Sequence, residues 1–204
     1  MIRHHPSPTL LLRCAAGQLP AAHDAVIEAH LARCPNCRAA LVDAMAVGGA
    51  LLDQTPKVAM AAGALDTVLA QLERPLPPVA PLKPAMDFVT HPPGRWRRVA
   101  PGVATMTLAP RDATGTRLDM LRVAPGSGLL SHGHHGLETL CVLQGAFDDG
   151  IERFAAGDFA EADDALDHRP VALPGEACVC IFATTGYLKP HGVLGRLVRP
   201  LLGM

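Results

Sequence analysis

One histidine and two cysteines stand close together in the segment AHLARCPNCRA, as His30-x3-Cys34-x2-Cys37. Residues four apart are neighbours on a helix, so His30 and Cys34 share one face. Pro35 breaks that helix just after Cys34, and Cys37 can approach from the next turn. One imidazole and two thiolates at this spacing suit tetrahedral zinc. The segment therefore predicts a zinc site.

A structural zinc site needs a fourth ligand, and the first part of the chain offers His4, His5, Cys14 and His23. His23 lies on the same helix face as His30 but about 10 Å away along the axis, so one ion cannot take both. Cys14 can reach the site only if its face of the first helix is turned that way. His4 and His5 lie on an arm before that helix and can fold back. The spacing leaves the choice open.

A second segment carries two histidines and a glutamate between flanking glycines, in the pattern Gly126-x5-His132-Gly133-His134-x3-Glu138-x6-Gly145. His132 and His134 are two residues apart, so on a strand both side chains point to one face. Glu138 keeps that parity after a short turn. Two imidazoles and a carboxylate suit Zn, Mn, Fe or Ni, and geometry decides which. The pattern predicts a second metal site.

The residues after Glu138 extend this parity argument. Leu140 and Val142 share its face and predict an apolar interior, whereas His135 and Cys141 have the opposite parity and should point away from the metal.

The elements that must hold these residues differ between the two halves of the chain. Proline, glycine and apolar spacing predict helices over 7–17, 20–34, 35–52 and 63–74. Five prolines in residues 75–84 predict an extended linker. Short alternating runs over 103–108, 117–123, 137–143 and 177–183 then predict an antiparallel sandwich or barrel.

Composition limits the functions open to this chain. It has 204 residues, of which 49% are hydrophobic, a formal charge of -1 and 3% aromatics. A packed core is expected, and a basic or aromatic footprint for nucleic acid is absent. No apolar run is long enough to span a bilayer, and no signal peptide stands at the start. We therefore expect a cytoplasmic protein whose six cysteines are thiols or metal ligands.

The first half resembles the zinc-binding anti-sigma domain. The resemblance is carried by His4-His5 near the start and by His30-x3-Cys34-x2-Cys37 on a short helical region. It implies that zinc is held by these three core residues and by His5, which matches the family's amino-terminal ligand by position. Some members carry a cysteine in the first helix, so Cys14 stays in reserve. The resemblance also implies a partner, an extracytoplasmic-function (ECF) sigma factor of RNA polymerase.

The second half resembles a cupin domain. The pattern from Gly126 to Gly145 matches the first cupin motif with both glycine spacings. The second motif should supply a further histidine. The segment Phe154-Ala155-Ala156-Gly157-Asp158-Phe159 resembles its glycine turn, with alanine in place of the usual proline. The resemblance then implies His168, which comes late, as the fourth ligand beside His132, His134 and Glu138, with zinc or another divalent transition metal.

Together the halves resemble ChrR-type transcriptional regulators over nearly the whole chain. This implies release of the sigma factor when the cupin senses an oxidant, notably singlet oxygen or an organic hydroperoxide. Cys178 and Cys180 resemble a late cysteine pair of such cupins. They are either a redox pair or two small apolar residues on one strand face, and a disulfide between them would be strained.

These observations predict an α+β chain of two domains, a zinc-bound helical bundle in residues 1–84 and an antiparallel, jelly-roll-like cupin barrel in residues 85–204. The predicted function is regulation of transcription by sequestering a sigma factor, without direct binding to nucleic acid or membrane. The alternative is a metal-dependent cupin enzyme, a dioxygenase or isomerase, with a zinc-binding helical appendage. The ligand types alone do not separate the two, because an open metal site serves either.

Overall fold

Helices occupy the first part of the chain. The computed structural model describes residues 1–72, 93–164 and 167–190, without the side chains of residues 134 and 187–190. The helices in this part of the chain are α1 (Pro8–Ala15), α2 (Ala21–Leu31), α3 (Pro35–Asp53) and α4 (Ala64–Leu72). They confirm the helical expectation, and the predicted proline linker lies outside the described residues. None of these helices combines the length and apolar character that a membrane span requires.

Local sequence explains where these helices begin. The Ser7 hydroxyl accepts a hydrogen bond from the Leu10 amide at 3.2 Å, and Pro8 occupies the first helical position of α1. Pro20 is the residue just before α2, and Pro35, like Pro8, is the first residue of its helix. Proline is tolerated at these positions because a first-turn amide has no partner within the helix.

The rest of the described chain is antiparallel. Its strands are β1 (Arg97–Ala100), β2 (Val103–Ala109), β3 (Thr116–Val123), β4 (His132–His135), β5 (Glu138–Gln144), β6 (Ala146–Asp148), β7 (Arg153–Ala155), β8 (Phe159–Ala162), β9 (Asp167–His168), β10 (Val171–Ala172), β11 (Cys178–Thr185) and β12 (Tyr187–Pro190). A large sheet has the order β1-β2-β3-β11-β5-β8, and two smaller sheets have the orders β10-β6-β7 and β12-β4-β9.

The interior of this sandwich is apolar and hollow. A core cluster joins Val123 and Val142 of the large sheet to Phe147 and Phe154 of a small one. A cavity of about 630 Å³ lies between the sheets. The predicted antiparallel cupin fold is confirmed, with its strands divided among three sheets rather than closed into one barrel.

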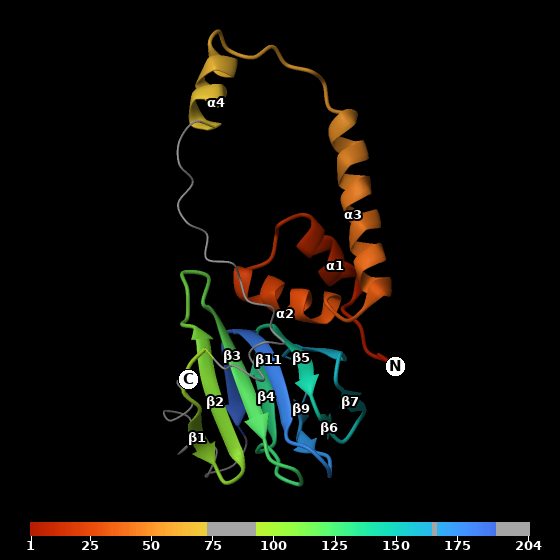
Figure 1. Ribbon diagram of the computed structural model, residues 1–204, viewed down its shortest axis with the longest axis vertical. Coiled ribbons are helices and arrows are strands. Elements are labelled where there is room, and N and C mark those ends of the chain that lie inside the picture. Colours follow the sequence, from red (N-terminus) through yellow and green to blue (C-terminus); the bar gives the residue numbers. More distant parts are fainter. Residues whose placement is uncertain (73–92, 165–166, 191–204) are drawn as a thin grey trace.

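Helix α2 covers the opposite face of the large sheet and contacts β3, β5 and β11. Val26 and Ile27 of α2 are fully buried in one core cluster with Met120, Cys141 and Ile181 of the sheet. Helix α3 runs away from the sheets, and α4 lies still farther out (Figure 1). The helical half and the cupin therefore share a hydrophobic core. The expected boundary at residues 84 and 85 lies outside the described part of the chain.

Candidate metal centres and their coupling

Four side chains meet at the junction between α2 and α3. His5, His30, Cys34 and Cys37 offer ligand atoms that all lie within 4.8 Å of one another. The Nδ1 atom of His5 is 3.4 Å from the Cys34 sulfur and 3.3 Å from the Cys37 sulfur. Two nitrogens and two sulfurs at these distances match the donor set of a structural zinc site.

The backbone at this junction brings the cysteines beside His30. Helix α2 ends at Leu31, earlier than the predicted end after Cys34. The Cys34 amide still donates to the His30 carbonyl at 3.0 Å, so the two residues stay adjacent. Cys34 then precedes α3 as its N-cap residue, with Pro35 first in the helix, and Cys37 lies in the first turn. The break forced by proline turns both sulfurs toward the histidine.

His30 has its free ring nitrogen directed into this cluster. Its Nδ1–H donates to the Gly157 carbonyl at 2.8 Å, because a carbonyl can only accept. The tautomer therefore leaves a lone pair on Nε2. That atom is buried and has no hydrogen-bond partner among the described residues. A buried acceptor without a donor is costly, and a metal ion removes that cost.

The thiols need a cation to ionise. Burial, together with the neighbouring Cys34 thiol, raises the pKa of Cys37 to about 12. Only the thiolate is a strong metal ligand, so binding releases protons and couples metal affinity to pH. The residues present fit zinc in both geometry and chemistry.

The other candidates for the fourth ligand lie elsewhere. His4 packs on Phe154 with ring centroids 4.3 Å apart and donates from Nε2 to the Arg153 carbonyl at 3.0 Å. The pKa of Cys14 is raised to about 11 by burial and by Asp24, which lies beside it.

His23 is buried between α2 and the sheet. Its two ring nitrogens lie 2.9 Å from the Thr139 hydroxyl and 2.8 Å from the Thr185 hydroxyl. Of the four residues left open by spacing, the structure brings only His5 into the cluster.

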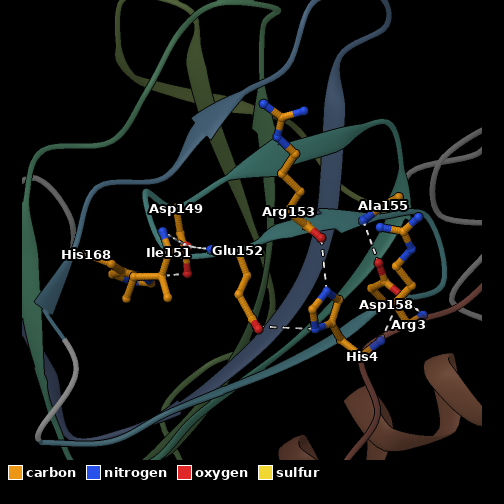
Figure 2. Close-up of polar contacts among 9 residues, drawn as sticks. All are labelled: Arg3, His4, Asp149, Ile151, Glu152, Arg153, Ala155, Asp158 and His168. Carbon is orange, nitrogen blue, oxygen red and sulfur yellow. Dashed lines mark hydrogen bonds and ion pairs between the residues drawn. The ribbon is translucent and has the colours of Figure 1, made fainter.

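The cupin residues converge at the edge of the cavity. Register pairing places His132 of β4 opposite His168 of β9, and their Nε2 atoms are 3.2 Å apart. The His132 Nδ1–H donates to the Leu130 carbonyl at 2.8 Å, which leaves a lone pair on Nε2. Nδ1 of His168 faces the Asp149 carboxylate at 3.6 Å (Figure 2). Converging imidazole nitrogens backed by carbonyl and carboxylate groups are typical of metal ligands.

Glu138 lines the same cavity. Burial raises the pKa of this carboxyl to about 8. His134 lies on β4, and its side chain is outside the described part of the structure. His135 is exposed, 3.4 Å from Asp164, and Cys141 is buried in the core under α2. These two positions agree with the parity prediction.

Cys178 and Cys180 point into the sandwich from β11. Both are buried free thiols that line the cavity, and their sulfurs are 3.7 Å apart. A hydrogen bond with Cys178 and burial raise the pKa of Cys180 far above its usual value. The Cys180 thiol is therefore held protonated, and a redox role for the pair remains a prediction.

Sequence reasoning missed the contacts that support both centres. The turn between β7 and β8 contains Gly157 and Asp158. The Gly157 carbonyl accepts a hydrogen bond from His30, and the Asp158 carboxylate binds the amino-terminal arm. Asp149, which faces His168, also accepts the amides of Ile151 and Glu152, both at 2.8 Å. The glycine turn was visible in the sequence, but its partners lie more than 100 residues away, where no local pattern points.

Comparison with known proteins agrees with this architecture. The family of ChrR cupin-like domains matches residues 86–189, and a zinc-finger family matches residues 10–38. The chain is 40% identical to the anti-sigma-E factor ChrR of Cereibacter sphaeroides, over 98% of this chain and 97% of that protein. It also matches a chain in the crystal structure of Rhodobacter sphaeroides SigE in complex with the anti-sigma ChrR. That match has a TM-score of 0.77 and 41% identity, and it covers 90% of this chain and 99% of that chain. The chain therefore belongs to the ChrR family of anti-sigma factors, regulators rather than enzymes, in which a zinc-finger region precedes a cupin-like domain.

Proposed function

We propose that this chain binds an ECF-type sigma factor through α3 and α4 and releases it when the cupin metal site meets an oxidant. In this proposal residues 1–84 form the sigma-binding part and residues 85–204 the sensing part. The protein works in the cytoplasm, where its thiols stay reduced. His5, His30, Cys34 and Cys37 hold zinc, and His132, His134, Glu138 and His168 hold zinc or another divalent transition metal.

The observation that carries this proposal is the bare apolar surface of α3. Only Cys37 is buried among the 19 residues of this helix. Large apolar side chains are exposed along it, at Val42, Met45, Val47, Leu51 and Leu52, and further ones follow on α4. Exposed apolar side chains gathered on one helix in this number mark a protein interaction site.

The apolar residues of α3 lie on more than one side of the helix. At 100° per residue, Val42, Met45 and Leu52 form one stripe, whereas Val47 and Leu51 lie on the other side. A helix that is apolar all round is a buried helix. A partner must therefore contact α3 on more than one side. A sigma factor is the partner we assign, because the related ChrR was crystallised in complex with SigE.

The zinc cluster helps to determine the direction in which this surface points. It joins the end of α2, which packs on the sheet, to the first turn of α3, which also packs against α1. When bound, zinc supplies a rigid tetrahedral link and no reaction chemistry. The four residues, together with the packing of α1 against α3, then fix the angle at which α3 leaves the sheet.

The cupin cavity supports the sensing part of the proposal. It offers an apolar chamber with His132, Glu138 and His168 on its wall. A small apolar oxidant can enter such a chamber and meet the metal ligands there. The alternative of an enzyme is weaker, because the relative matched over almost the whole chain is a regulator.

Binding of the full chain to its sigma factor tests the interaction surface. A Val42→Asp and Met45→Asp double variant should lose at least about 100-fold in affinity, measured by calorimetry, since charges must be buried without partners. Gln54→Asp, which adds a charge just beyond α3, is the matched control and should stay within about twofold. Normal binding by a folded, zinc-loaded double variant would contradict the assigned surface.

A further inference from the structure

The zinc cluster is built from both halves of the molecule. His5 lies on an amino-terminal arm that runs along β7 and β8. His30 lies on α2 and is bonded to Gly157 of the turn between those strands. Two of the four ligand residues therefore depend on the cupin for their position, although all four precede the proline linker.

Asp158 contacts both the arm that carries His5 and the turn that binds His30. It is 2% exposed. Its Oδ1 atom accepts the Arg3 amide at 2.7 Å and the His4 amide at 3.2 Å, while its Oδ2 atom accepts the Ala155 amide at 2.8 Å. Figure 2 shows the carboxylate between the arm and the strand. One oxygen thus holds the arm immediately before His5, and the other shapes the turn that presents the Gly157 carbonyl to His30.

Neighbouring contacts keep the arm in the same place. The Phe159 amide donates to the His4 carbonyl at 3.1 Å, and Ser7 donates through its amide and hydroxyl to Glu161 at 3.3 and 3.1 Å. His5 itself is exposed and meets the His30 ring edge to face, so little of its own side chain is packed. Its position depends mainly on the hydrogen bonds that Arg3, His4 and Ser7 make on either side of it.

We propose that Asp158 is a positioning residue of the zinc site, so that the cupin helps to set zinc affinity. This inference rests on the proposed zinc ligation by His5, His30, Cys34 and Cys37. Groups that orient metal ligands without touching the metal change affinity by roughly 10- to 100-fold. The cupin can then act on the sigma-binding half through the β7–β8 turn as well as through the chain connection.

Cobalt titration of the full chain, followed by displacement with zinc, tests this inference. The thiolate-to-cobalt absorption band reports the Cys34 and Cys37 site, with Cys34→Ser as the baseline. Asp158→Asn supplies one carbonyl oxygen and one NH₂ group, so either the arm amides or the Ala155 amide lose their acceptor. We expect zinc affinity to fall by about 10- to 100-fold, and affinity equal to the wild type in the folded variant overturns the inference.

A second variant leaves Asp158 and its turn intact. Arg3→Pro removes the amide that donates to Asp158, whereas Arg3→Ala keeps it and is the matched control. Arg3→Pro should weaken zinc binding by about tenfold, at the lower end of the same range, and Arg3→Ala should leave it unchanged. Equal affinity of the two variants overturns the inference, even if Asp158→Asn does not fold.

A double-mutant cycle separates positioning from general stability. If Asp158 acts partly through His5, the loss caused by Asp158→Asn should shrink when His5→Ala is already present. Strictly additive losses overturn this role. An unchanged cobalt band in Cys34→Ser would instead disprove the proposed zinc ligands, so failure of the ligation and failure of the positioning role give different results.

Discussion

Helices α2 and α3 are neighbours in sequence, yet they are buried to very different degrees. Of the 11 residues of α2, those buried are Ala22, His23, Val26, Ile27, Ala29, His30 and Leu31. Of the 19 residues of α3, only Cys37 is buried. Both helices are rich in alanine and aliphatic residues, so composition does not separate them. The difference is that α2 lies on the large sheet and α3 projects beyond it (Figure 1).

This difference places the boundary between the packed and the exposed helices at the cluster of His5, His30, Cys34 and Cys37. The arm and α2 belong with the sheet by packing, and α1 packs against α3, whereas most of α3 and all of α4 present bare apolar surface. Cys34 and Cys37 lie between the helix that is buried on the sheet and the helix that is exposed. A metal bound at that point would help to hold the direction of α3, together with its packing against α1.

The largest expected effect comes from removing that metal. Cys34→Ser or His30→Ala should abolish zinc binding and raise the sigma-binding Kd by more than about 100-fold, because structural zinc contributes on the order of 10 kcal/mol to small domains. Metal content and calorimetry measure the two effects. Cys14→Ser, which changes a thiol outside the cluster, should keep the zinc content and the sigma-factor affinity of the wild type. Zinc retained at full content in Cys34→Ser and His30→Ala would contradict the ligand set.

The next prediction separates the sensing part from the binding part. A His132→Ala and His168→Ala double variant should keep sigma inhibition and lose induction by singlet oxygen or an organic hydroperoxide. Moving a complex from almost all bound to almost all free needs about 5.5 kcal/mol, a scale that a reaction of the oxidant at an intact metal site supplies and loss of one surface contact does not. Transcription from a sigma-dependent promoter, with and without oxidant, is the measurement.

The exposed His135 provides the control for this separation. It lies beside the cupin ligands in sequence but faces Asp164 at the surface, so His135→Ala should induce normally. Normal induction by the His132 and His168 double variant would remove the sensing proposal and leave the sigma-binding proposal standing.

A smaller effect is expected when the sheet is removed. A fragment of residues 1–84 retains the zinc ligands and the apolar face of α3, so we expect it to bind the sigma factor. It loses the Gly157 and Asp158 contacts, and zinc affinity should fall by about tenfold or more. It also exposes Val26 and Ile27, which lowers solubility. Zinc affinity equal to that of the full chain would show that the shared core plays no part in metal binding.

Sequence reasoning succeeded where the signal is local. Helix starts at Pro8 and Pro35, the pairing of His30 with the two cysteines and the parity of Glu138 and Cys141 all follow from spacing over a few residues. The meeting of His132 with His168 followed from family resemblance and is produced by register between β4 and β9.

The remaining features depend on contacts between distant segments. The docking of α2 on the sheet and the role of Asp158 join residues far apart in the chain, and His5 was preferred to Cys14 by family resemblance rather than by spacing. Sequence spacing carries no information about such contacts, because tertiary packing decides which apolar face is covered. The end of α2 at Leu31 rather than Cys34 is a smaller miss. The residue before a proline is disfavoured in the helical region, and Cys34 accordingly has an extended backbone.

The smallest predicted effect concerns His23, at the contact between α2 and the sheet. Burial, and then Arg13, lowers its pKa to about 4, with Asp112 opposing. The unfolded chain takes up a proton near pH 6.5, whereas the folded chain keeps this ring neutral. The neutral His23 ring therefore makes its full contribution to the free energy of unfolding above about pH 6.5. That contribution is lost as the pH falls toward 4.

A glutamine at this position tests the argument, because it can bond both threonine hydroxyls without titrating. Denaturant unfolding of the wild type and of His23→Gln, at several values between pH 7 and pH 4.5, gives the difference in unfolding free energy. The wild type should lose about 1–3 kcal/mol more than the variant over this interval. Protons taken up by the zinc ligands affect both proteins alike and cancel in the difference. A difference independent of pH would mean that His23 stays accessible to protons, and that α2 is less firmly docked on the sheet than its buried residues indicate.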